Sequence, residues 1–141
     1  MAKLSFGGMY FSTATATTLT TATPAKALGT TTAMELGDFT MPANNRLTYT
    51  AATTRSFEVI ACVSMSAAGA TNSTIYIAKN DSVIAASAIQ RKISTGGDIG
   101  ALAVSVSTQM DQNDYVELWL ENDDGDNMTV ENGTVTVKVL G

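Results

Sequence analysis

Carboxylates are the side chains best suited to chemistry in this sequence, and Glu117 and Glu121 stand out among several possible pairs. Glycoside hydrolysis needs two carboxyl groups that face one sugar. Apolar and polar residues alternate over residues 113–121, which predicts a strand. At ~3.3 Å per residue the two carboxylates would lie about 13 Å apart, beyond the range of roughly 6.5–9.5 Å used in inverting hydrolysis. We therefore predict that Glu117 and Glu121 form a solvated or interface rim.

Other catalytic arrangements lack their essential residues. The sequence has no His, which removes the commonest general base and the commonest metal ligand. It also has no Gly-rich phosphate loop, nucleophile elbow or Cys-x-x-Cys motif. The single Cys62 lies in an apolar run, so we interpret it as a small buried residue and not as a reactive thiol. We expect no enzymatic activity and no cofactor.

An acidic segment at residues 123–127 groups several oxygen ligands, as a calcium loop does. Its spacing does not fit an EF-hand loop. With Gly125 at the sixth position, the first ligand position falls on Leu120, and Glu131 reaches the twelfth only if the rest of the pattern is broken. We expect a polar turn between strands, with a metal site as the alternative.

Composition restricts the partners of the chain. Its 141 residues carry a formal net charge of -5, and the eight Lys and Arg residues are scattered. A nucleic-acid surface needs clustered basic residues, so we expect no nucleic-acid partner. No apolar run approaches the ~18 residues of a membrane span, and residues 1–20 lack the layout of a signal segment. We expect a protein that is made and assembled in a cytoplasm, with no membrane partner.

The pattern of apolar residues predicts the fold. From Arg46 onward, alternating runs are separated by turn signals, which is typical of an antiparallel sandwich. The longest run spans residues 55–66, and residues 83–93 fit either a helix or a strand, with their flanks favouring a strand. The pair Asn132-Gly133 lies between two alternating runs and predicts a hairpin. About eight strands predict an all-β fold, an antiparallel jelly-roll sandwich over residues 46–141.

Residues 1–45 differ in composition and are predicted to form an extended N-terminal arm with a leading strand. Residues 12–32 are rich in Thr and Ala, which indicates extended or irregular chain lying across a surface. The arm begins with an apolar cluster that is too large for a free tail and should dock onto another surface. This cluster comprises Leu4, Phe6, Met9, Tyr10 and Phe11.

The strand predicted at residues 113–121 has two different faces. Its core face carries three apolar side chains, whereas Tyr115 and Trp119 share the other face with the two glutamates. Three explanations of these outward aromatic residues stay open. The first is that a loop of the same chain covers them, the second is that another subunit packs on them, and the third is that a sugar stacks on them.

Two runs resemble a known family. They are residues 76–84 (Tyr-Ile-Ala-Lys-Asn-Asp-Ser-Val-Ile) and residues 114–122 (Asp-Tyr-Val-Glu-Leu-Trp-Leu-Glu-Asn). The chain from Arg46 onward is similar to the tumour-necrosis-factor-like and complement-head-like jelly rolls of tailed-phage virion proteins. Asp81 stands where those hairpins often have Gly. The resemblance implies a homotrimer around a threefold axis, with aromatic and aliphatic side chains of one sheet packed at the axis.

The resemblance also implies a function, that of a capsid decoration (cement) protein. Such a protein binds the outside of a phage head as a homotrimer and holds neighbouring capsomers together, so its partners are itself and the major capsid protein. It resides on the capsid exterior of the virion after assembly in the host cytoplasm. The expected capsid or intersubunit anchor is Leu4, Phe6, Met9, Tyr10 and Phe11, and the expected trimer interface is Tyr115 and Trp119.

A fibre head is the alternative function. A receptor- or glycan-binding head at the end of a tail fibre would use the loops around Gly69, Gly96 and Gly125. For the decoration protein, we expect deletion of residues 2–11 to leave a folded trimer that no longer adds to shells.

Overall fold

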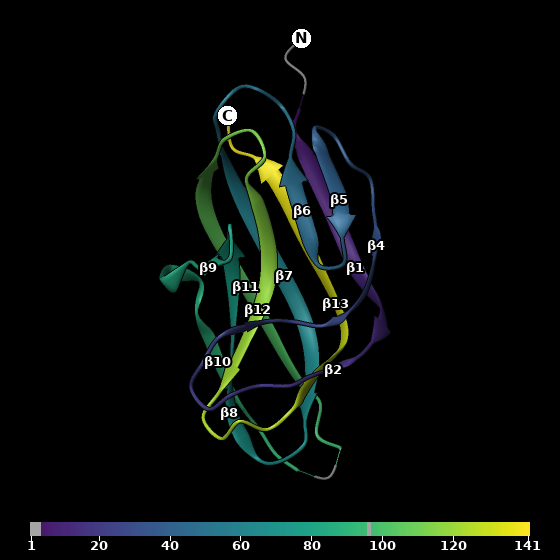
Figure 1. Ribbon diagram of the computed structural model, residues 1–141, viewed down its shortest axis with the longest axis vertical. Coiled ribbons are helices and arrows are strands. Elements are labelled where there is room, and N and C mark those ends of the chain that lie inside the picture. Colours follow the sequence, from purple (N-terminus) through teal and green to yellow (C-terminus); the bar gives the residue numbers. More distant parts are fainter. Residues whose placement is uncertain (1–3, 96) are drawn as a thin grey trace.

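The computed structural model describes residues 4–95 and 97–141, which form two facing antiparallel sheets (Figure 1). Sheet I contains β1 (Phe6–Ala14), β2 (Ala16–Thr17), β4 (Gly29–Ala33), β7 (Arg55–Ala67), β11 (Gly100–Met110) and β13 (Met128–Val139). Sheet II contains β3 (Ala25–Lys26), β5 (Phe39–Ala43), β6 (Arg46–Tyr49), β8 (Thr71–Lys79), β9 (Ser82–Val83), β10 (Ile89–Ile93) and β12 (Tyr115–Asn122). The predicted all-β antiparallel sandwich is confirmed.

The order of strands in each sheet places sequence-distant segments side by side. Sheet I runs β11-β7-β13-β1-β4, with β2 also on β13. Sheet II runs β10-β8-β12-β6-β5, with β3 also on β12 and β9 on β8. In the part of the chain that the structure describes, no helix has the length and hydropathy needed to cross a membrane.

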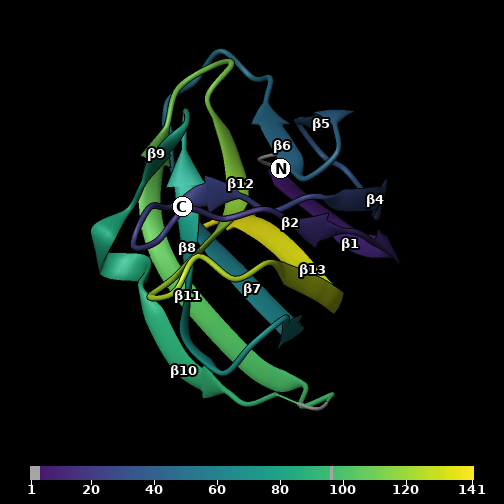
Figure 2. The ribbon, with the colours of Figure 1, turned by 60° about the horizontal axis from the view of Figure 1, so that its bottom comes forward.

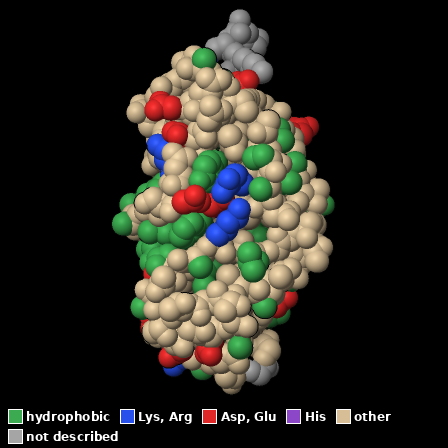
Figure 3. All heavy atoms as spheres, viewed as in Figure 1, with side chains coloured by type: hydrophobic (Ala, Val, Ile, Leu, Met, Phe, Trp, Pro, Cys, Tyr) green, Lys and Arg blue, Asp and Glu red, His purple; other side chains and the backbone are tan. Residues whose placement is uncertain are grey.

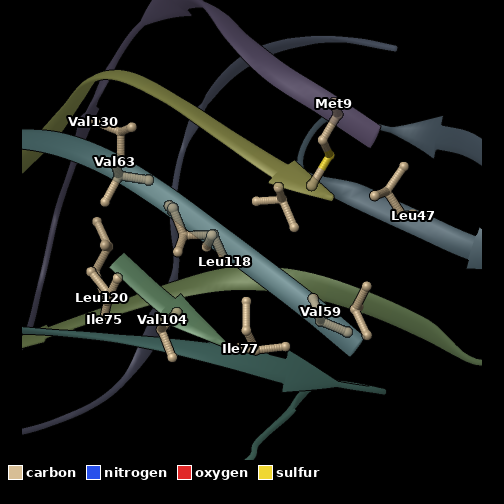
Figure 4. Close-up of a cluster of buried hydrophobic side chains, with 14 of the residues drawn as sticks. Met9, Leu47, Val59, Val63, Ile75, Ile77, Val104, Leu118, Leu120 and Val130 are labelled. Carbon is tan, nitrogen blue, oxygen red and sulfur yellow. The ribbon is translucent and has the colours of Figure 1, made fainter. Parts of the chain in front are cut away.

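The core lies between the sheets and follows the predicted alternation. On β7, alternate residues from Phe57 to Met65 point inward and are buried, and on β12 Val116, Leu118 and Leu120 are fully buried. Figure 4 shows side chains of both sheets meeting in this core. A cluster of three aromatic rings closes one part of it, with ring centroids of Tyr49 and Phe57 4.9 Å apart.

The start of the chain is part of the sandwich. β1 lies inside sheet I, paired with β13 on one side and β4 on the other. Its residues Met9 and Phe11 are 0% and 5% exposed and belong to the core. This corrects the expectation that both residues dock onto a capsid or a second subunit. Deletion of residues 2–11 would remove most of this central strand, so we no longer expect a folded deletion variant.

The extended chain predicted in residues 12–32 is found at residues 15–28, here called the strap. Through β2 the strap pairs with β13 of sheet I, and through β3 it pairs with β12 of sheet II. It therefore crosses from one sheet to the other, as Figures 1 and 2 show. Leu19 and Ala27 bury their side chains beneath it.

The hairpin predicted at Asn132-Gly133 is absent, because β13 continues through both residues. The register of β13 against β7 shifts between Val130 and Asn132, which marks a bulge. A Cβ at Gly133 would lie 2.6 Å from Cγ1 of Val63. Glycine here permits close approach of two strands and does not form a turn.

Residues 79–93 form a hairpin, a short helical turn and an edge strand. Asn80 and Asp81 have φ values of 51° and 63°, as a two-residue turn of type I′ requires, so this turn forms with Asp in place of Gly. The ambiguous region beyond it contains β9, a 3-10 turn at Ala85–Ser87 (η1) and β10, so the strand prediction is correct at both ends only.

Candidate functional site

Asn45 joins three segments at the edge of β12. Strand β6 pairs with the start of β12, and β3 pairs with it at Trp119 and Leu120. Between them, the Asn45 Nδ2 donates to the Leu118 carbonyl at 2.8 Å, and the Leu118 N–H donates to the Asn45 Oδ1 at 2.9 Å. The side chain thus continues the sheet where no strand does. This buried role of Asn45 was not predicted from the sequence.

Glu117 is fully buried within its own chain on the outer side of β12, so the predicted solvated or interface rim is wrong for this residue. Its Oε2 lies 2.7 Å from the Arg46 Nε and 2.9 Å from the Lys26 Nζ. Its Oε1 accepts a hydrogen bond of 3.0 Å from the Trp119 Nε1. Strand β6 and the strap carry the two cations over the carboxylate, which supplies the pairing that a buried charge needs. Burial lowers the pKa of Arg46, but the hydrogen bond and charge of Glu117 outweigh it and hold that pKa above its ordinary value.

Tyr115 and Trp119 lie on the outer face of sheet II, as predicted, and both are partly covered by their own chain. The Arg46 guanidinium lies 3.9 Å from the centre of the Tyr115 ring. A hydrogen bond with Asp81 raises the pKa of Tyr115, and burial adds to this effect. Trp119 pairs with Tyr76 on one side and with Lys26 on the other. Their assignment to a trimer interface stays a prediction.

The outer face of sheet I carries an apolar groove of about 690 Å³. Cys62 is exposed in this groove, which corrects its interpretation as a buried residue. The Cys62 side chain points outward because the other face of β7 forms the core. Its pairing partner on β11 is the small residue Ala103. The groove is lined by Tyr10, Phe11, Cys62, Val63, Ser64, Ala101, Leu102, Ala103, Asn132, Gly133 and Thr134. None of these residues is charged. The lack of charged residues at these positions is visible in the sequence, but no groove was predicted from it.

Three of the five predicted anchor residues are on the surface. Leu4, Phe6 and Tyr10 are 69%, 37% and 43% exposed. Phe6 is hydrogen-bonded through its backbone to Gly37, and exposed Met34 and Leu36 lie in the segment just before that glycine. We call Leu4, Phe6, Met34 and Leu36 the N-terminal patch. A shallow hollow of about 440 Å³ beside it is lined by Phe6, Gly7, Gly8, Met34, Glu35, Thr136, Val137 and Lys138.

The acidic loop after β12 is organised around a buried amide. Asn122 Oδ1 accepts hydrogen bonds from the backbone N–H groups of Asp124 and Gly125, and its Nδ2 donates to the Asp126 carbonyl at 2.7 Å. Asp123 accepts a hydrogen bond from Asn72. This is the geometry of a polar turn. Gly96, named with Gly69 and Gly125 for a fibre head, lies outside the described residues.

Comparisons with known proteins identify the fold. No protein-family model and no curated protein matches the sequence. Among solved structures, Eiger TNF from S. frugiperda superposes with a TM-score of 0.63 at 9% identity, over 99% of this chain and 94% of that one. Murine APRIL superposes with a TM-score of 0.60 at 7% identity, over 96% of this chain and 99% of that one. At such low identity the likeness concerns architecture alone. The chain has a tumour-necrosis-factor-like jelly-roll fold.

Proposed function

We propose that this protein is a structural virion protein, a homotrimer that binds the outer surface of a phage head and stabilises the shell. Its partners are then further copies of itself and the major capsid protein. The observation that carries the proposal is the uncharged groove on the outer face of sheet I. The sequence motifs near β8 and β12, together with the jelly-roll fold, support the same assignment. No reaction is involved.

Sheet I is the better candidate for the self-association face. Interface centres are depleted of charged residues, and the groove around Cys62 and Tyr10 has none. On sheet II, by contrast, the sequence-predicted residue Trp119 already bonds to Glu117, and Arg46 covers Tyr115. A second subunit would gain less by covering side chains that already have partners. In a ring of three, each copy would present its groove to a different surface of its neighbour.

The N-terminal patch is the proposed contact with the shell. Its four side chains are exposed and apolar, and two of them, Phe6 and Met34, line one hollow. Three linked copies would each place one patch on the shell. After the first patch binds, the remaining contacts become intramolecular, so individually weak contacts produce firm attachment.

The single cysteine and the single tryptophan allow a direct test of the trimer, because they lie on opposite outer faces. Native mass spectrometry should show a trimer. In that trimer we expect a thiol reagent to modify Cys62 slowly, whereas acrylamide quenches Trp119 as in a monomer. Protected Trp119 with reactive Cys62 would instead place the interface on sheet II. A monomer at working concentration would contradict the proposal.

Shell attachment is tested by adding purified trimer to undecorated heads. The variant Leu4→Asp/Phe6→Asp should keep its oligomeric state and lose most of its binding. Leu28→Asp is a matched control, because Leu28 is also exposed but lies on the strap. If both variants bind undecorated heads equally well, the N-terminal patch is not the contact with the shell. Copy number separates the two candidate functions, since decoration requires many copies per virion and a fibre head requires few.

A further inference from the structure

Glu117 fixes the orientation of Trp119. A buried ion pair is weak evidence for stability, since its replacement by apolar residues is often neutral or stabilising. The definite effect of this carboxylate is geometric. One oxygen binds the indole N–H at 3.0 Å, while the other is held by Arg46 at 2.7 Å. The ring of Trp119 is therefore held in one position on the outer face of sheet II.

Tyr76 provides a second fixed ring beside it. Tyr76 and Trp119 stand opposite each other on β8 and β12, so their side chains are neighbours on one face. The Tyr76 hydroxyl donates to Glu121 Oε1 at 3.1 Å. Burial raises the pKa of Tyr76, and the hydrogen bond to Glu121 adds to the rise, so the hydroxyl remains a donor. Both rings are partly exposed, and each is held by a carboxylate of β12. We call this pair the aromatic platform.

The charges around the aromatic platform are paired within the chain. Lys26 and Arg46 share Glu117, and Arg46 also lies 3.7 Å from Asp81. Figure 3 shows basic and acidic side chains together beside an apolar area near the middle of the face seen in Figure 1. A phosphate or sulfate group would have to compete with Glu117 for both cations. The charge pattern favours an uncharged ligand.

Neutral saccharides match this combination of groups. A sugar ring has an apolar face of C–H groups that packs on an aromatic ring, and hydroxyls at its edge that need hydrogen-bond partners. Glu121 and Lys26 flank the two rings, and each keeps hydrogen-bonding capacity beyond its contact with Tyr76 or Glu117, so they offer an acceptor and a donor to sugar hydroxyls. We propose that the aromatic platform of Tyr76 and Trp119 binds a neutral saccharide. This binding is separate from capsid decoration and does not depend on the trimer.

Trp119 is its own reporter for the test. The full chain is titrated with maltoheptaose and with the methyl glycosides of glucose, galactose, mannose and N-acetylglucosamine. Dextran sulfate is titrated in parallel as an anionic probe. Fluorescence and the NMR signal of the indole N–H are followed. We expect a saturable change with at least one of these sugars, with a dissociation constant on the order of 1 mM. Flat aromatic sites without a deep pocket bind sugars weakly, so tighter binding is not required.

Variants locate the binding. Tyr76→Ala removes half of the platform, keeps the reporter and should weaken binding about three- to tenfold. Glu121→Gln preserves shape and should weaken it by a smaller factor, so it serves if Tyr76→Ala does not fold. Ile99→Ala is the control, because Ile99 is an exposed apolar residue outside the platform, the groove and the N-terminal patch. It should bind as the unaltered protein does.

Three results would overturn the proposal. The first is no saturable response to any of these sugars. The second is unchanged affinity in the folded Tyr76 and Glu121 variants. The third is a response to dextran sulfate alone, which would identify an anion site at Lys26 and Arg46 instead.

Discussion

Replacement of Asn45 by glycine should remove much of the stability of the sandwich. Asn45 is fully buried, and its amide bonds to the Leu118 N–H, the Leu118 carbonyl and the Ala27 carbonyl. Glycine keeps the backbone conformation, since φ of Asn45 is 54°. The Leu118 carbonyl retains the Ala27 N–H at 3.0 Å, so two buried groups lose a partner. At about 1–3 kcal/mol for each, the expected loss is roughly 2–6 kcal/mol.

Urea unfolding followed by Trp119 fluorescence measures this loss, because Trp119 is adjacent to Leu118 in β12. The midpoint should fall while the slope stays the same, since the same surface is exposed on unfolding. Asn113→Gly is the matched control. Asn113 also has a positive φ, 75°, but its side chain is exposed. A loss at Asn45 no larger than the loss at Asn113 would refute the idea that the amide of Asn45 completes the sheet.

Three further substitutions test other parts of the fold. Gly133→Ala should lower the free energy of unfolding by about 1–3 kcal/mol, because its Cβ would lie 2.6 Å from Val63; an unchanged melting temperature would contradict the close packing of β13 on β7. Asp114→Asn should destabilise the protein at neutral pH, with a difference that shrinks in acid. Burial raises the pKa of Asp114, but hydrogen bonds from the Asp111 N–H and Asn80 and the charge of Lys79 outweigh burial and hold this pKa below its ordinary value of 3.8. The stabilisation that the Asp114 carboxylate provides is therefore complete well above pH 3.8 and is lost as the pH falls through the folded-state pKa. Urea midpoints of the variant and of the unaltered protein, measured from neutral pH into acid, test this prediction. A difference in midpoint that does not change with pH would contradict it. Ser73→Ala should be neutral or stabilising by up to about 1 kcal/mol, because the buried Ser73 hydroxyl has no hydrogen-bond partner among the residues that the structure describes. A clear loss in thermal unfolding would contradict this.

The inward faces of β7 and β12 were predictable because alternation is a local property of the sequence. The same alternation, applied to Cys62, places its side chain on the outward face of β7. Its apolar neighbours in the sequence suggested burial, but their side chains point to the other side. Strand parity was therefore the better guide, and it would have shown the exposed thiol.

Contacts between distant segments account for what the sequence did not show. Gly133 resembles a turn residue locally, yet it is required by β7, which lies against it in sheet I. Glu117 resembles a surface carboxylate, yet Arg46, 71 positions away, bonds to it. Neither partner can be inferred before the pairing of strands is known.

The proposed self-association face and the proposed saccharide site lie on opposite outer faces of the sandwich. In a sandwich they point in opposite directions, since both inner faces form the core. A trimer closed through the groove of sheet I would leave the aromatic platform of each copy facing outward. Three platforms on one trimer, repeated over a shell, would bind a repeating saccharide far more tightly than one platform does. In the proposed trimer, the weak affinity expected of a single platform is therefore compatible with firm attachment to a glycan-rich surface.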